Sequence, residues 1–244
     1  MQITPKEIAS VAAAEAPRFD LYTVIHKALR AFMADTLLAV GRMDAADDLE
    51  LAQVTDRVLQ LLDTCRGHLQ HENDFVHTAI EARAPGASEA VAHEHVEHEQ
   101  HIAQLAAHVA ALRGAAPAIR PAAAARLYGA LALFIADNFR HMDVEETAHN
   151  ALLWARYTDA ELVTLHDRLV GSIAPAEMLL VMRWMVPFMN PMERMHVLGD
   201  MRAKAPPPAF QAVLDTVRPH LTTAEWGKLA RALALPAAPG LATA

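Results

Sequence analysis

Apolar residues recur every three or four positions along most of the chain, and helix breakers divide this pattern into long segments. Pro85 ends the second segment, Gly114 ends the third, and Pro121 begins the fourth, because proline is tolerated in the first turn of a helix. Short connections between long helices predict an up-down-up-down four-helix bundle over residues 17–157. The four predicted helices cover residues 17–43, 49–84, 88–113 and 121–157.

After residue 157 the segments become shorter, and prolines separate them. Thr158 followed by Glu161 predicts a capped helix start, since each of these side chains can accept a backbone N–H that the first turn leaves unpaired. We expect residues 158–235 to form a helical C-terminal extension that caps the bundle. The Pro- and Ala-rich tail, residues 236–244, is expected to be disordered.

Composition supports helix throughout. Hydrophobic residues make up 53% of the 244 residues, aromatic residues only 5%, and there are nine glycines. Ala and Leu dominate, and both favour helices over sheets. The sequence therefore predicts an all-α protein.

Charge and cysteine content narrow the choice of partners and compartment. A net charge of −8 argues against nucleic acid, which requires clustered Lys and Arg. The single cysteine, Cys65, suits a reducing compartment. Charged residues interrupt the N-terminal segment, so no signal peptide is expected, and no uncharged stretch approaches the ~20 residues of a membrane span. We expect a soluble, cytoplasmic protein with no membrane partner; the sequence does not predict its oligomeric state.

The second and fourth helices carry the same motif. Residues 68–83 align without a gap on residues 141–156, so that His68 meets His141 and Glu72 meets Glu145. Apolar positions agree as well, as Leu61 meets Phe134 in the same alignment. Because residues four apart are neighbours on a helix, each His-x-x-x-Glu should face the bundle centre.

The first and third helices each supply a further histidine. His26 is followed at +7, +11 and +14 by apolar residues, and His98 is followed by apolar residues at the same offsets. His26 to His68 spans 42 positions and His98 to His141 spans 43. We therefore expect His98 to face inward. The neighbouring histidines are expected at the edges of the helix or on its solvent face: His93, His95 and His101.

Four inward imidazoles and two inward carboxylates predict a metal centre. Buried carboxylates that face each other are costly unless a cation joins them. Mixed imidazole and carboxylate donors suit iron, manganese or zinc. Two carboxylates between two imidazole pairs describe a site for two metal ions. The predicted ligands are His26, His68, Glu72, His98, His141 and Glu145.

With these residues in this order, the chain resembles the hemerythrin-like, His-His-Glu cation-binding family over roughly residues 19–156. The resemblance implies two iron ions, the first held by His26 and His68 and the second by His98 and His141. Glu72 and Glu145 would bridge the two ions, as the resemblance implies.

The chain also departs from the oxygen-carrying hemerythrins. They place two histidines four apart on the third helix, whereas Glu94 stands four residues before His98 here. Their last carboxylate follows its histidine by five residues, which would select Glu146 instead of Glu145. The internal repeat favours Glu145, and this arrangement resembles the F-box iron-sensor branch. Whether Glu94 or Glu146 also binds metal stays open at this point.

Several other side chains could lie near such a centre. Tyr22, one turn before His26, is expected in the core, and Cys65 is expected to be a small buried residue and not a nucleophile. A further set of histidines is expected at the surface or around the ligands, not among them: His71, His77, His101 and His149.

The resemblance implies a non-haem di-iron protein that binds O2 or a related small oxidant, such as peroxide or nitric oxide, for sensing or protection. One alternative is a di-iron oxidase or oxygenase whose small substrate lies under the C-terminal helices. Another is an interaction module that responds to iron. Manganese and zinc accept the same ligands as iron.

Overall fold

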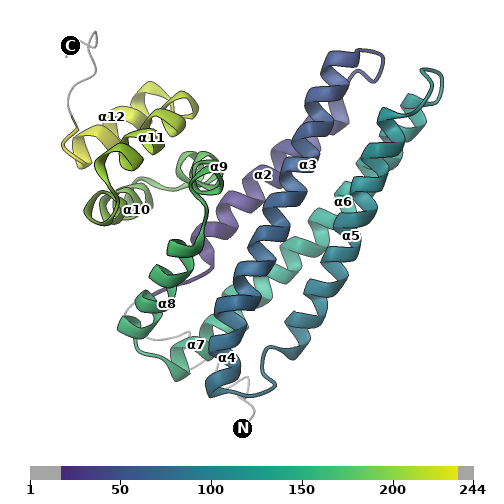
Figure 1. Cartoon of the computed structure of the whole chain (residues 1–244). Helices are drawn as coiled ribbons and strands as arrows, with labels where there is room; N and C mark the ends of the chain where they lie inside the picture. The colour runs from purple at the N-terminus through teal and green to yellow at the C-terminus, as the bar shows by residue number, and fades with distance from the viewer. Residues whose placement is uncertain (1–17, 236–244) are drawn as a thin grey trace. The chain divides into compact units, whose positions relative to one another are not determined.

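The computed structural model describes residues 18–235, and every regular element in this range is helical. Figure 1 shows long helices running side by side and joined by short connections. Pro17, the predicted start of the first helix, and the tail at residues 236–244 lie outside the described residues. The predicted all-α bundle is confirmed. Its main helices are α2 (Thr23–Arg42), α3 (Asp48–His71), α5 (Glu89–Arg113) and α6 (Arg120–Val144).

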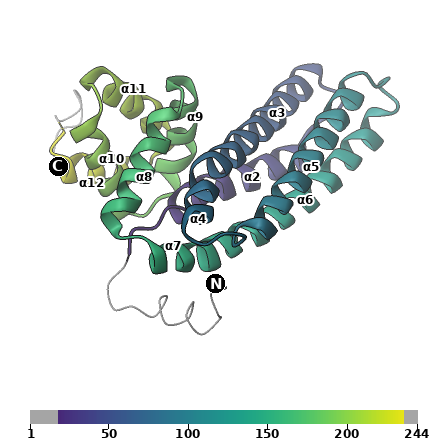
Figure 2. The same ribbon diagram turned by 60° about the horizontal axis from the view of Figure 1, so that its bottom comes forward.

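Two of these helices continue through a wider turn. A π-helical segment, η1 (Glu72–His77), connects α3 to α4 (Thr78–Arg83), and a second, η2 (Glu145–His149), connects α6 to α7 (Asn150–Arg156). Each composite helix corresponds closely to one long segment predicted from the sequence. Figure 2 shows α4 and α7 at the same end of the bundle.

Local sequence explains where the helices begin. The Asp47 carboxylate accepts the backbone N–H groups of Leu49 and Glu50 at the start of α3. The predicted capping box is present at the start of α8 (Asp159–Ser172), where Thr158 and Glu161 satisfy each other's backbone donors.

The end of the bundle that carries α4 and α7 is closed by a small apolar cluster. Tyr22, Ile80 and Leu153 pack together with Leu162 of α8. Arg18 fixes the segment before α2 next to this cluster, because its guanidinium donates to the Asp159 carboxylate and to two backbone carbonyls. As a result α8 belongs to the same compact unit as the bundle, which extends to Ile173. The sequence had placed the boundary one helix earlier, after residue 157.

The second compact unit begins at Ala174 and consists of short helices. Arg194 lies at its centre with 4% of its surface exposed. Its guanidinium donates to the carbonyls of Val186 and Pro187 and to the Glu225 carboxylate. The elements of this unit are α9 (Pro175–Met185), η3 (Val186–Phe188), α10 (Pro191–Lys204), α11 (Pro207–Val217), η4 (Arg218–His220) and α12 (Thr223–Ala232).

Helix length and apolar composition decide whether a helix of the described residues could cross a membrane. No single helix among them is long and apolar enough to cross a bilayer, and one bent pair of consecutive helices, residues 159–188, passes only when taken together.

Candidate metal centre

Both His-x-x-x-Glu motifs sit where an α-helix widens into a π turn. Glu72 is the first residue of η1 and Glu145 is the first residue of η2. Short π segments inside α-helices are frequent at functional sites. The two motifs therefore share their local geometry as well as their sequence, and both carboxylates are buried, with Glu145 fully enclosed.

One group of donor atoms gathers around His26 and His68. The His26 Nε2 lies 3.7 Å from Glu72 Oε1 and 3.5 Å from Glu145 Oε2, and the His68 Nε2 lies 3.1 Å from Glu72 Oε1. The donor atoms of these four residues all lie within 4.8 Å of one another. Ligands bound at about 2.1 Å to one ion are about 3–3.5 Å apart, so the spacing suits a shared cation.

A second group gathers on the other side of the same carboxylates. The His95 Nε2 lies 3.5 Å from Glu72 Oε2 and 3.6 Å from Glu145 Oε1, and the His141 Nε2 lies 3.3 Å from Glu145 Oε1. These four donors also lie within 4.8 Å of one another. Each glutamate therefore presents one oxygen to the first group and the other oxygen to the second, which is the arrangement of two bridging carboxylates.

The polar atoms of this cluster fit a pair of bound cations. Both oxygens of Glu72 and both oxygens of Glu145 lack a hydrogen-bond partner among the described residues, as do the Nε2 atoms of His26 and His68. A buried carboxylate without partners is strongly disfavoured. Divalent cations between the imidazoles and the carboxylates would remove this penalty.

Outer hydrogen bonds orient three of the imidazoles. The Nδ1–H of His26 donates to Glu146 at 3.0 Å, and the Nδ1–H of His141 donates to Glu94 at 2.7 Å. The Nδ1–H of His95 donates to the side-chain oxygen of Asn73 at 2.8 Å. Such bonds fix the tautomer and leave Nε2 for the metal. Glu94 and Glu146 thus hold the His141 and His26 imidazoles in place and do not belong to either donor group.

Without metal, the cluster is stabilised by protons. Burial lowers the pKa of His26, but its hydrogen bond to Glu146 and the negative charges of the neighbouring Glu72 and Glu145 outweigh this effect and raise the pKa to about 9. The pKa of His141 also rises to about 9 against the effect of burial, because the Glu145 carboxylate lies 3.3 Å from its Nε2 and Glu94 accepts its Nδ1–H. Burial raises the pKa of both bridging glutamates, yet the surrounding imidazoles bring each pKa below its ordinary value. Bound metal would therefore displace protons from these imidazoles.

The third helix differs from the prediction. The expectation that His95 lies at the edge or on the solvent face is wrong, because its side chain is only 2% exposed and reaches both carboxylates. His98 is buried as predicted, but its ring packs against His141 and Phe134, and none of the donor groups found among the described residues includes it. Burial and the neighbouring His141 lower the pKa of His98 to about 4.

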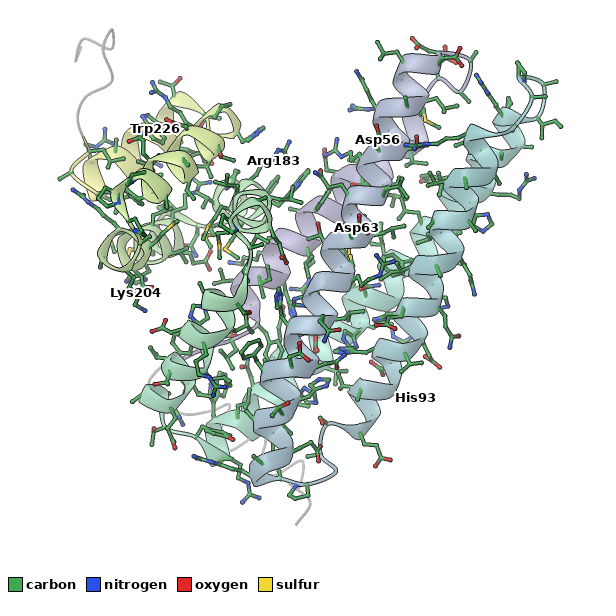
Figure 3. The ribbon with its side chains drawn as sticks, in the orientation of Figure 1. Asp56, Asp63, His93, Arg183, Lys204 and Trp226 are labelled. Carbon is green, nitrogen blue, oxygen red and sulfur yellow. The ribbon has the colours of Figure 1, made fainter. Side chains whose placement is uncertain are left out.

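The remaining histidines of the third helix follow the prediction more closely. His93 is 76% exposed and lies on the outer side of α5 (Figure 3). His101 is half-buried and takes no part in the donor groups of the described residues. Five of the six predicted ligands are therefore brought together, and His95 occupies the place expected for His98.

Three further predictions concern side chains near the cluster. Tyr22 is buried, and its hydroxyl lies 3.3 Å from the Nδ1 of His149. His77 and His149 are buried next to the two glutamates. Of the two positions predicted for them, the surface and the surroundings of the ligands, they occupy the second. Cys65 is 2% exposed, and burial raises the pKa of its thiol to about 12, which agrees with an inert core residue.

Comparison with known proteins agrees with this geometry. The family model described as the hemerythrin HHE cation-binding domain matches residues 19–152. Neither the curated proteins nor the solved structures gave a match. The matched span covers more than half of the chain and contains both His-x-x-x-Glu motifs. The chain therefore belongs to the hemerythrin HHE cation-binding domain family.

Proposed function

We propose that the protein is a non-haem di-iron protein that binds O2 or a related small oxidant, such as peroxide or nitric oxide, for sensing or protection. The observation that supports this proposal best is the pair of shared carboxylates, each with one oxygen directed to either imidazole pair. Iron is a usual partner of imidazole and carboxylate donors. The first ion would be held by His26 and His68, and the second by His95 and His141.

The count of protein donors favours reaction with a small molecule. Each ion would have two imidazoles and two shared carboxylates, against the six ligands of an octahedral site. Iron held by these residues would supply electrons to a small oxidant, and the protein side chains would leave part of its coordination open. The protein's own side chains orient the imidazoles through Glu146, Glu94 and Asn73 and keep the bridging carboxylates out of bulk water.

The test starts from protein purified without added metal. Elemental analysis should find two iron ions per chain, and a stoichiometry near one would contradict the proposal. The protein is then reduced anaerobically, exposed to O2 and returned to an inert atmosphere while the absorption spectrum is recorded. We expect a spectral change that removal of O2 does not reverse. A spectrum unaffected by O2, peroxide and nitric oxide would refute the binding of small oxidants.

The same experiment distinguishes the proposal from reversible oxygen carriage and from a reaction of loosely bound metal. Full recovery of the reduced spectrum over several cycles would indicate reversible oxygen carriage. Loss of O2 reactivity in His95→Ala, with reactivity retained in His93→Ala, would assign the reaction to the cluster and not to loosely bound metal.

A further inference from the structure

A third set of donor atoms lies next to the proposed pair of metal positions. One ring nitrogen of His77, one ring nitrogen of His149 and one carboxylate oxygen of Glu145 lie within 4.8 Å of one another. All three side chains are buried, with exposed fractions of 5%, 3% and 0%. This group shares Glu145 with the pair but uses two imidazoles that neither of the other groups contains.

The π turns explain how these imidazoles come together. His77 follows Glu72 by five residues, and in a regular α-helix this offset would place it about 140° away around the axis. In η1 the backbone instead forms wider turns with i→i+5 bonds, which return the fifth residue towards the face of the first. His149 is the last residue of η2, four residues after Glu145. Both imidazoles therefore lie about one turn beyond the bridging glutamates.

The hydrogen-bonding state of the two imidazoles points to a ligand. Neither ring nitrogen of His77 has a hydrogen-bond partner among the described residues, although the side chain is 95% buried. An unpaired buried polar group is destabilising, so a ligand at this position would be stabilising. The Nδ1 of His149 is engaged by the Tyr22 hydroxyl at 3.3 Å, which leaves Nε2 as its second donor. Metal-binding histidines commonly have their other nitrogen held in this way.

We propose that His77, Glu145 and His149 hold a third divalent cation of the zinc or ferrous class. Two imidazoles and one carboxylate form a three-ligand set that both metals accept, with the remaining positions left to water. Glu145 can serve this ion as well as the pair, because a carboxylate has two oxygens and about four lone-pair directions. Tyr22 is the positioning residue for this site, since it contacts His149 and not the cation.

The third cation binds more weakly than the other two. It shares a carboxylate with the pair, so it meets the repulsion of nearby cations in a buried site where charges are poorly screened. It also has three protein donors, whereas each position of the pair has four. On stepwise addition of metal it should bind last, and during chelation it should leave first.

Zinc binding to metal-free protein tests the proposal without relying on redox activity. Full-length protein is equilibrated with Zn²⁺ by dialysis and the bound metal is counted, with circular dichroism as a check on folding. We expect three Zn²⁺ per chain in the wild type and in the exposed control His93→Ala. We expect two in His77→Asn and in His149→Asn, with the affinity of those two unchanged. Tyr22→Phe should weaken only the last ion, by about 10–100-fold.

Two results would overturn the third site. One is a wild type that saturates at two ions with unchanged counts in both Asn variants. The other is loss of a tightly bound ion in these variants, which would assign His77 and His149 to the pair itself. If one variant does not fold, the other carries the test. A wrong assignment of the two-metal centre would give a different result. In that case the double variant His95→Ala/His141→Ala would still bind both of the tightly held ions.

Discussion

Replacing His95 by alanine should remove one of the two tightly bound metal ions. His95 lies on α5, and its Nε2 is within 3.6 Å of an oxygen of each bridging glutamate. The substitution leaves His141 as the single imidazole of its group. The partner group around His26 and His68 keeps all its donors, so the first ion should stay bound.

The size of the effect follows from the number of donors. Sites with four protein ligands bind zinc with about 10–16 kcal/mol, so one ligand of four contributes about 2.5–4 kcal/mol. Because about 1.4 kcal/mol corresponds to a factor of ten, the affinity for the second ion should fall by about 10²–10³-fold. His98→Ala should instead lower the free energy of unfolding by about 1–3 kcal/mol through lost packing, with little change in metal affinity.

Competition with a chromophoric chelator measures both affinities in the same titration. Wild type and His93→Ala should show two tight Zn²⁺ ions, His98→Ala should show two, and His95→Ala should show one. The opposite pattern, with an ion lost in His98→Ala and retained in His95→Ala, would refute the assignment and restore the register predicted from the sequence.

Further predictions concern other buried groups. Glu146→Ala or Glu94→Ala should weaken metal binding by about 10–100-fold without changing the number of ions at saturation, and an unchanged affinity in the chelator assay would contradict their orienting role. Arg194→Met should lower the free energy of unfolding by about 3 kcal/mol, because two carbonyls and the Glu225 carboxylate lose their hydrogen-bond donor. Chemical denaturation measures this difference, and a change below about 0.5 kcal/mol would contradict a stabilising role for Arg194. The Cys65 thiol should react with a disulfide reagent only after denaturation, and rapid labelling of the folded protein would show that the core opens.

The bundle could be predicted from the sequence because its helices are long and their breakers are unambiguous. Apolar positions recur over six or seven turns, and the predicted ends at Arg113 and Met43 fall within one residue of the observed ends. The end of the bundle unit was harder to place. Leu162 packs onto the bundle core through tertiary contacts that no local pattern in α8 reveals.

The choice between His95 and His98 shows where pattern analysis fails. Both residues lie on the buried face of α5, so hydrophobic periodicity alone cannot distinguish them. They differ in position by about 4.5 Å along the helix axis, and only the His95 ring lies level with the carboxylates of Glu72 and Glu145. The prediction assumed that both hairpins have equal length, whereas the second places 46 positions between its two donors, His95 and His141. The π turns that bury His77 likewise leave no distinct signal in the sequence.

Metal bound at the proposed cluster would also stabilise the folded bundle. Its donors come from α2, α3, α5 and α6 and from the π turns that follow two of them. Their outer hydrogen bonds run between helices, from His26 to Glu146 and from His141 to Glu94. An ion that binds only the folded state stabilises it in proportion to the logarithm of its concentration over Kd. With iron bound as proposed, the geometry that suits reaction with an oxidant would also make the fold responsive to iron, so one site would serve both an oxidant-binding role and an iron-responsive role.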